Sequence, residues 1–130
     1  MNVLIDSSIW IDYFRSGDQT DFMDLLIEEN LISTNDLILT ELIPFLKVKG
    51  QKKLIGLLES IRRFELRIDW QEIQDFQVKC IKVGINGVGI PDLIIAQNAK
   101  QNDSPLCSLD KHFIQMAPKV KLKIFDGRSK

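Results

Sequence analysis

The chain has 130 residues, of which 45% are hydrophobic and 27% are charged, as in an ordinary soluble globular domain. This length predicts one domain, residues 1–130, that buries a sizeable core without cross-links. The formal net charge of −1 excludes a protein that holds nucleic acid by bulk positive charge, so such binding would need local patches or a metal.

The cysteines and the hydropathy limit the compartments in which the protein is expected to occur. Cys80 and Cys107 lie far apart and are flanked by apolar residues, which predicts buried thiols in a cytoplasmic protein. No apolar stretch approaches membrane-spanning length, and the N-terminus lacks the basic region of a signal peptide. With two cysteines and one histidine, a zinc site is not expected.

The first predicted element is a strand from Asn2 to Asp6. Its Val-Leu-Ile run is apolar on both faces, which is typical of a central parallel strand. A helix begins at Ser7 or Ser8 and continues to about Arg15. Asp6 therefore lies at the carboxyl end of a strand, where α/β sheets bind ligands. Asp6 could equally cap the helix, and this stretch alone leaves both readings open.

The middle of the chain alternates between strands and helices. A helix capped by Asp18 or Thr20 ends near Asn30, and a strand follows it. Two further helices are expected before a half-exposed strand, and a long helix starts at Trp70. The predicted ranges of these later elements are a strand over 31–34, helices from Asn35 or Asp36 through Pro44 and from about 53 to 63, a strand over 64–68 and a helix over 70–83.

The last third predicts a helix from Pro91 through Ala99, a strand over 105–109 and a short helix over 111–116. A final strand over 120–125 carries lysines at alternate positions, as protected edge strands do. Strands that alternate with helices predict an α/β fold: a three-layer sandwich with a mainly parallel central sheet flanked by helices.

Two carboxylates occur within apolar helical patterns. Glu41 shares a face with Leu37, Ile38 and Phe45 in a segment that is apolar all round, so we expect it to be buried and either in a salt bridge or bound to a cation. Asp92 follows Pro91 in the first turn of a helix, where it either complements the helix dipole or faces a cleft.

Asp110 resembles Asp6, because it follows an apolar strand and could cap the next helix. If the two strands are parallel neighbours, both carboxylates reach one edge of the sheet. Clustered carboxylates repel one another, and Mg²⁺ or Mn²⁺ with oxygen ligands relieves that repulsion. Such a centre supports attack of metal-activated water on a phosphodiester.

Four motifs in this order resemble the PIN-domain ribonucleases, in particular the VapC-type toxins of VapBC toxin–antitoxin pairs, and the resemblance covers essentially the whole chain. The motifs span residues 4–12, 39–42, 90–96 and 108–113. Ser108 stands where the family often has Thr, and Leu109 where it often has a basic residue. Neither departure removes a carboxylate.

The resemblance implies a metal-dependent endoribonuclease, a hydrolase that uses Mg²⁺ or Mn²⁺. The family's acidic quartet corresponds to Asp6, Glu41, Asp92 and Asp110 as catalytic and metal-binding residues, and Ser7 is the assisting hydroxyl. It also implies an RNA substrate, with transfer RNA as one candidate, inhibition by a VapB-like antitoxin, and a homodimer.

The alternative from a different class is a non-catalytic PIN-like module that only binds RNA or a protein. The intact quartet argues against it. A Ser-His-Asp hydrolase would have to use the single histidine, His112, but no glycine-flanked nucleophile is present. We expect His112 to have a structural role in the last motif.

Two surface features remain open at this stage. Lysines around Gly50 could contact RNA phosphates or form a solvated turn, and aromatic and apolar residues near the first two helices could form either an antitoxin groove or core. The lysines are Lys47, Lys49, Lys52 and Lys53, and the second set is Trp10, Tyr13, Phe14, Phe22, Leu25 and Leu26.

Overall fold

A computed structural model describes residues 2–127 of the chain. The elements alternate much as predicted, in the order β1 (Val3–Ile5), α1 (Ser7–Arg15), α2 (Met23–Glu28), β2 (Ile32–Asn35), α3 (Asp36–Val48), α4 (Lys52–Ser60), β3 (Arg62–Phe64), α5 (Trp70–Lys82), α6 (Ile90–Gln101), β4 (Leu106–Cys107) and α7 (Lys111–Val120). None of these helices is both long and apolar enough to cross a membrane.

The four strands form one sheet in the order β3-β2-β1-β4, and every neighbouring pair is parallel. Leu4 of β1 pairs with Ser33 of β2 on one side and with Leu106 of β4 on the other. The predicted parallel α/β fold is therefore confirmed. Because all strands point the same way, their carboxyl ends meet at one edge of the sheet.

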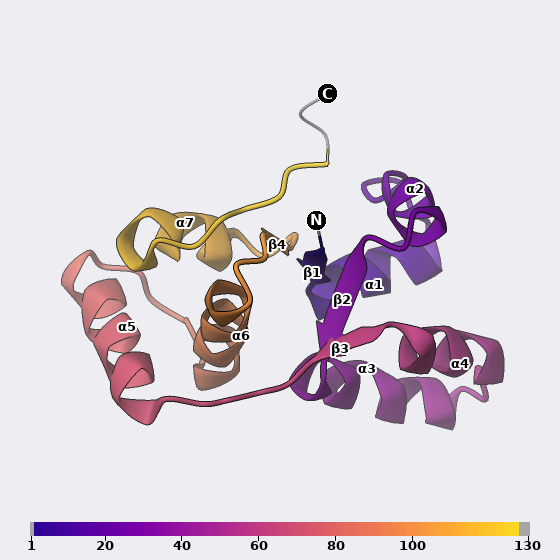
Figure 1. Cartoon of the computed structure of the whole chain (residues 1–130), viewed down its shortest axis with the longest axis horizontal. Coiled ribbons are helices and arrows are strands. Elements are labelled where there is room, and N and C mark those ends of the chain that lie inside the picture. The colour runs from indigo at the N-terminus through magenta and orange to yellow at the C-terminus, as the bar shows by residue number, and fades with distance from the viewer. Residues whose placement is uncertain (1, 128–130) are drawn as a thin grey trace.

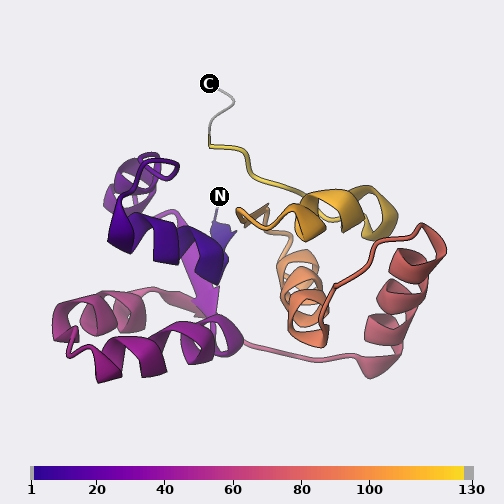
Figure 2. The ribbon, with the colours of Figure 1, turned by 180° about the vertical axis from the view of Figure 1, so that it is seen from behind.

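Helices α1 to α4 gather on one side of the sheet, and α5 to α7 gather on the other (Figures 1 and 2). The β1 residues are fully buried beneath them, as expected for a strand covered on both faces. Trp10, Phe76 and Phe113 are the largest buried side chains, and they come from helices of both groups. One core thus joins the two groups and fixes the carboxyl edge of the sheet between them.

Several predicted boundaries are wrong for local reasons. The second helix is confined to α2, and neither Asp18 nor Thr20 caps it, because the Thr20 hydroxyl instead donates to Asp12 at 2.9 Å. The helix expected to reach Arg63 ends at Ser60, and the half-exposed strand forms earlier, as β3. β3 lies at an edge of the sheet and is largely exposed, but it shares only Phe64 with the predicted range 64–68.

The predicted final strand over 120–125 is also wrong. Helix α7 continues through Pro118 to Val120 and ends at Lys121, whose φ of 59° closes the helix in a left-handed conformation. Only an isolated parallel bridge between Ile124 and Leu106 follows. The lysines here are exposed and alternate with buried Val120 and Leu122, but the segment does not form a strand.

Helix α3 is not the fully buried helix that its composition predicts. Ile38, Leu39, Leu42 and Leu46 are buried, but the side chain of Phe45 is 63% exposed. Glu41 is also exposed over much of its side chain. α3 therefore has one buried face, and Glu41 lies beside that face instead of within it.

Candidate metal centre

The carboxyl edge of the sheet holds the predicted acidic residues. Asp6 directly follows β1, Asp110 follows β4 after two residues, and Asp92 lies in the first turn of α6. The negative charge of Asp110 acts on Asp92, that of Asp92 acts on Glu41, and that of Asp6 acts on both Asp92 and Glu41. All four predicted carboxylates are thus close enough to interact electrostatically.

Asp6 is 5% exposed and is the N-cap of α1. Its Oδ2 accepts hydrogen bonds from the hydroxyls of Ser8 and Ser108, both at 2.8 Å, and from the Ser8 backbone N–H at 3.4 Å. Asp6 therefore caps α1 itself, and the helix begins at Ser7. These three donors converge on one oxygen and do not engage the second oxygen of Asp6.

The two serines also connect Asp6 to the loop that carries Asp110. The Ser108 hydroxyl accepts from the Asp110 backbone N–H at 2.9 Å, and the Ser8 hydroxyl accepts from the Leu109 backbone N–H at 2.9 Å. The two hydroxyls lie 3.2 Å apart. This network holds the carboxyl ends of β1 and β4 in register, so the two carboxylates share one environment.

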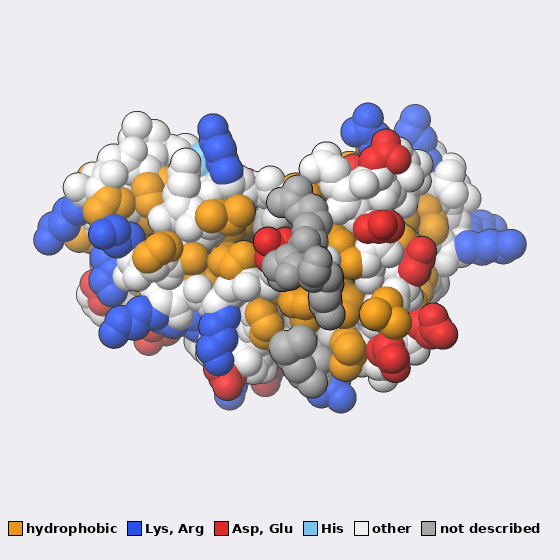
Figure 3. Space-filling model, turned by 90° about the horizontal axis from the view of Figure 1, so that it is seen from above, with side chains coloured by type: hydrophobic (Ala, Val, Ile, Leu, Met, Phe, Trp, Pro, Cys, Tyr) orange, Lys and Arg blue, Asp and Glu red, His pale blue; other side chains and the backbone are white. Residues whose placement is uncertain are grey.

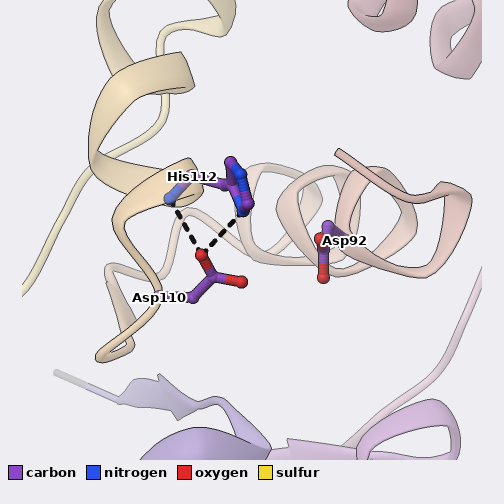
Figure 4. A group of neighbouring side chains, drawn as sticks. All are labelled: Asp92, Asp110 and His112. Atoms are coloured by element: carbon purple, nitrogen blue, oxygen red, sulfur yellow. Dashed lines mark hydrogen bonds and ion pairs between the residues drawn. The ribbon is translucent and has the colours of Figure 1, made fainter. Parts of the chain in front are cut away.

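Asp110 repeats this arrangement as the N-cap of α7. Its Oδ1 accepts a hydrogen bond from the backbone N–H of His112 at 2.9 Å and lies 2.9 Å from the Nδ1 of the same residue. Figure 4 draws both contacts. In Figure 4 its second oxygen points toward Asp92. The structural role expected for His112 therefore includes the orientation of a site carboxylate through the imidazole ring.

The pKa values of Asp92 and Glu41 are both raised above their usual range in this cluster. Desolvation raises the pKa of Asp92, and the charge of Asp110 raises it further, against a backbone hydrogen bond from Gly89 that lowers it. Desolvation likewise raises the pKa of Glu41, opposed by a hydrogen bond from the Ser7 hydroxyl and reinforced by the charges of Asp6 and Asp92.

No Lys or Arg within residues 2–127 forms an ion pair with Glu41, so its salt-bridge alternative finds no support there. Ligand atoms of Asp92, Asp110 and His112 lie within 4.8 Å of one another, close enough for one ion to contact them. Carboxylates in a partly desolvated site, without a Lys or Arg ion pair among the described residues, fit a hard divalent cation.

Three contributors to the site were not identified as such from the sequence. Ser8 and Ser108 bind the Asp6 carboxylate, and His112 binds Asp110. The signal for His112 was its position two residues after an N-cap aspartate, where its backbone N–H is the expected capping donor. No local signal connects Ser108 with Asp6, because 102 positions separate them along the chain.

The fold and this edge define an α/β domain with an acidic centre at the carboxyl ends of parallel strands. The family model of the PIN domain matches residues 3–119. The chain therefore belongs to the PIN domain family, and the resemblance inferred from its four motifs is confirmed at that level.

Solved structures share the fold at low sequence identity. VapBC2 from Rickettsia felis, bound to a DNA fragment from its promoter, is 19% identical with a TM-score of 0.73, over 97% of this chain and 100% of that one. DNA-bound VapBC from Salmonella typhimurium is 12% identical with a TM-score of 0.74, over 98% of each chain. VapBC-1 from nontypeable Haemophilus influenzae is 18% identical with a TM-score of 0.72, over 98% of each chain. A search of curated protein sequences finds no match.

Proposed function

We propose that this protein is a Mg²⁺- or Mn²⁺-dependent endoribonuclease and the toxin of a type II toxin–antitoxin pair. The observation that carries the proposal is the convergence of Asp6, Glu41, Asp92 and Asp110 on one edge of the sheet without a Lys or Arg ion pair among the described residues. Membership of the PIN family and the VapBC complexes among its structural neighbours support it.

A bound divalent cation would supply an activated water and stabilise negative charge on phosphoryl oxygens. Asp6, Asp92, Asp110 and Glu41 would hold it. Ser8 and Ser108 fix one oxygen of Asp6, and His112 fixes one oxygen of Asp110, so the remaining oxygens are preoriented. Ser7 is placed to hold Glu41 through its hydroxyl.

The test is cleavage of total RNA by purified protein with Mn²⁺, with Mg²⁺ and with a chelator, followed by mapping of the new ends. We expect cleavage only with metal. Equal cleavage in the chelator would refute metal dependence. Metal binding without any cleavage would favour the alternative, a PIN-like module that binds RNA or protein without cutting, and mapped ends would decide whether transfer RNA is the substrate.

An antitoxin is the partner that fits the groove between α1, α2 and α4, whose cavity volume is about 630 Å³. Tyr13 and Phe14 line it together with Leu54 and Leu57, while Asp21 and Asp24 add negative charge, which favours an amphipathic helix with basic flanks. The predicted groove needs revision, however, because Trp10 is fully buried and Leu26 is 6% exposed, so both belong to the core.

The remaining parts of the proposal are a homodimer and a cytoplasmic setting. Cys80 and Cys107 are both buried thiols, as a reducing compartment allows. Lys and Arg side chains are dispersed over the face in Figure 3. RNA contacts from Lys47, Lys49, Lys52 and Lys53 remain part of the proposal, as contacts of one turn around Gly50. Light scattering of the isolated protein tests the dimer.

A further inference from the structure

Two fully buried asparagines join the helix that carries Glu41 to the helix that carries Asp92. Asn35 is 0% exposed and Asn98 is 1% exposed, although amide side chains are seldom so deeply buried. The Asn35 Nδ2 donates a hydrogen bond to the Asn98 Oδ1 at 2.8 Å. Asn35 is the last residue of β2, directly before α3, and Asn98 lies within α6, so this bond joins the carboxyl end of β2 and the start of α3 to α6.

Each amide makes a second hydrogen bond that fixes its orientation. The Asn35 Oδ1 accepts from the Ile38 backbone N–H at 2.9 Å, so Asn35 is also the N-cap of α3. The Asn98 Nδ2 donates to the Glu65 carbonyl at 3.0 Å, in the extended segment that crosses from β3 to α5. With donors and acceptors both engaged, neither side chain can rotate without leaving a buried polar group unpaired.

The bond lies at the same sequence distance from two site carboxylates. Glu41 lies on α3, six residues after its N-cap Asn35, and Asp92 comes six residues before Asn98 on α6. Six helical residues correspond to roughly 9 Å of rise, so Asn98 lies away from Asp92 on α6, and Asn35 lies away from Glu41 at the start of α3. A change in the contact between α3 and α6 at the asparagines is transmitted along both helices to the carboxylates.

We propose that Asn35 and Asn98 are positioning residues that set the separation of Glu41 and Asp92, and hence the affinity of the acidic cluster for its divalent cation. The inference rests on the proposed metal-dependent function. An apolar pair would fill the same volume but would not fix one relative placement of the helices, since only the hydrogen bond is directional.

The chain offers a matched control on the same helix. Gln97 is 1% exposed. Its Nε2 donates to the Asp69 carbonyl at 3.1 Å and to the Glu72 carboxylate at 2.7 Å. Its Oε1 accepts from the Asp69 backbone N–H at 3.1 Å. These bonds join α6 to the start of α5 and not to α3. Gln97→Ala therefore removes a buried, hydrogen-bonded amide without changing the α3–α6 contact.

The experiment has two measurements. The dissociation constant for Mn²⁺ is obtained by titration, with unbound Mn²⁺ quantified by electron paramagnetic resonance. The free energy of unfolding is obtained by urea unfolding in a chelator. The variants are Asn98→Ala, Asn35→Ser and Gln97→Ala in the full chain. Asn35→Ser retains a capping hydroxyl for α3 and loses only the bond to Asn98, so it stays informative if Asn98→Ala fails to fold. RNA cleavage is measured separately on the wild type.

We expect both asparagine variants to bind Mn²⁺ about tenfold more weakly, as is typical when residues that orient metal ligands are removed. Gln97→Ala should stay within about twofold of the wild type, despite a comparable loss of stability. Unchanged Mn²⁺ affinity in the asparagine variants, or equal loss in Gln97→Ala, would overturn the positioning role. A wild type that binds Mn²⁺ but cuts no RNA would overturn the proposed function alone, and one that binds no Mn²⁺ would overturn both.

Discussion

Replacement of Asp6 by Asn or by Ala separates the two roles of this residue. One oxygen of Asp6 caps α1 and accepts from Ser8 and Ser108, and we propose that the other binds a cation. An Asn side chain keeps an acceptor for the first role, since Asn is as good an N-cap as Asp. It loses the negative charge that the second role requires.

The expected stability change for Asp6→Asn is small. Two hydroxyl hydrogen bonds to a carboxylate become bonds to a neutral amide, at a cost of about 1 kcal/mol each. The loss of repulsion toward Glu41 and Asp92 offsets part of this cost, because those residues interact with the charge of Asp6. The net destabilisation should therefore be about 0–2 kcal/mol, and the protein should remain folded.

Asp6→Ala removes the acceptor altogether. Loss of the cap costs about 1 kcal/mol, and loss of the bonds from Ser8 and Ser108 adds roughly 1–3 kcal/mol. The cost of losing the hydroxyl hydrogen bonds is limited because Ser8 keeps Ser108 and the Leu109 N–H as hydrogen-bond partners. We expect a total destabilisation of about 2–4 kcal/mol, clearly larger than for Asn.

The assay combines urea unfolding in a chelator with RNA cleavage in Mn²⁺. Asp6→Asn should unfold close to the wild-type midpoint and lose cleavage, whereas Asp6→Ala should lose both stability and cleavage. Wild-type cleavage by Asp6→Asn would refute the metal-binding role. Equal destabilisation of the two variants would refute the capping geometry.

Three further predictions follow from the same geometry. Ser108→Ala should lower the free energy of unfolding in urea by about 1–3 kcal/mol, since it removes a hydrogen bond to Asp6 and one from the Asp110 N–H. The control Ser60→Ala loses one exposed hydrogen bond to a carbonyl and should change urea unfolding by less. Equal changes in the two variants would argue against the serine network. In a chelator, the free energy of unfolding should fall as pH rises above roughly 4, because the pKa values of Asp92 and Glu41 are raised in the folded state, which therefore binds the carboxyl protons more tightly than the unfolded state. Glu41→Gln should flatten this pH profile. An unaltered slope in that variant would contradict the role given to Glu41. Mn²⁺ should raise the unfolding midpoint most at neutral pH, where the carboxylates are ionised, and thermal scans at pH 5 and 7.5 would show no such difference if the cluster does not bind the ion.

The order of elements was predictable because it depends on local pattern. The apolar run before Asp6 and the Pro91 start of a helix each specify an element from a few neighbouring residues, and the structure confirms both. The strand over 120–125 was wrong because strand formation needs a partner: only Ile124 meets one, and α7 extends past Pro118 instead.

The buried placement predicted for Glu41 was wrong for a related reason. Composition predicts that an apolar helix is covered on all sides, but coverage depends on which neighbours pack against it. α3 leaves Phe45 exposed, and Glu41 shares that partial exposure. Its pKa is nevertheless raised, because desolvation acts together with the charges of Asp6 and Asp92, which the sequence places 35 and 51 residues away.

The sequence by itself determined which carboxylates stand at strand ends and helix starts, because residue type and periodicity are local properties. It left open whether Asp6 and Asp110 cap helices or form a site. In the tertiary structure one oxygen of each carboxylate caps a helix while the charges of both act on Asp92, so capping does not exclude a place in the acidic cluster. Only folding brings Ser108 to Asp6, His112 toward Asp92 and Asn35 to Asn98, because the hydrogen bonds and charges that orient the site act between segments that are distant in the chain.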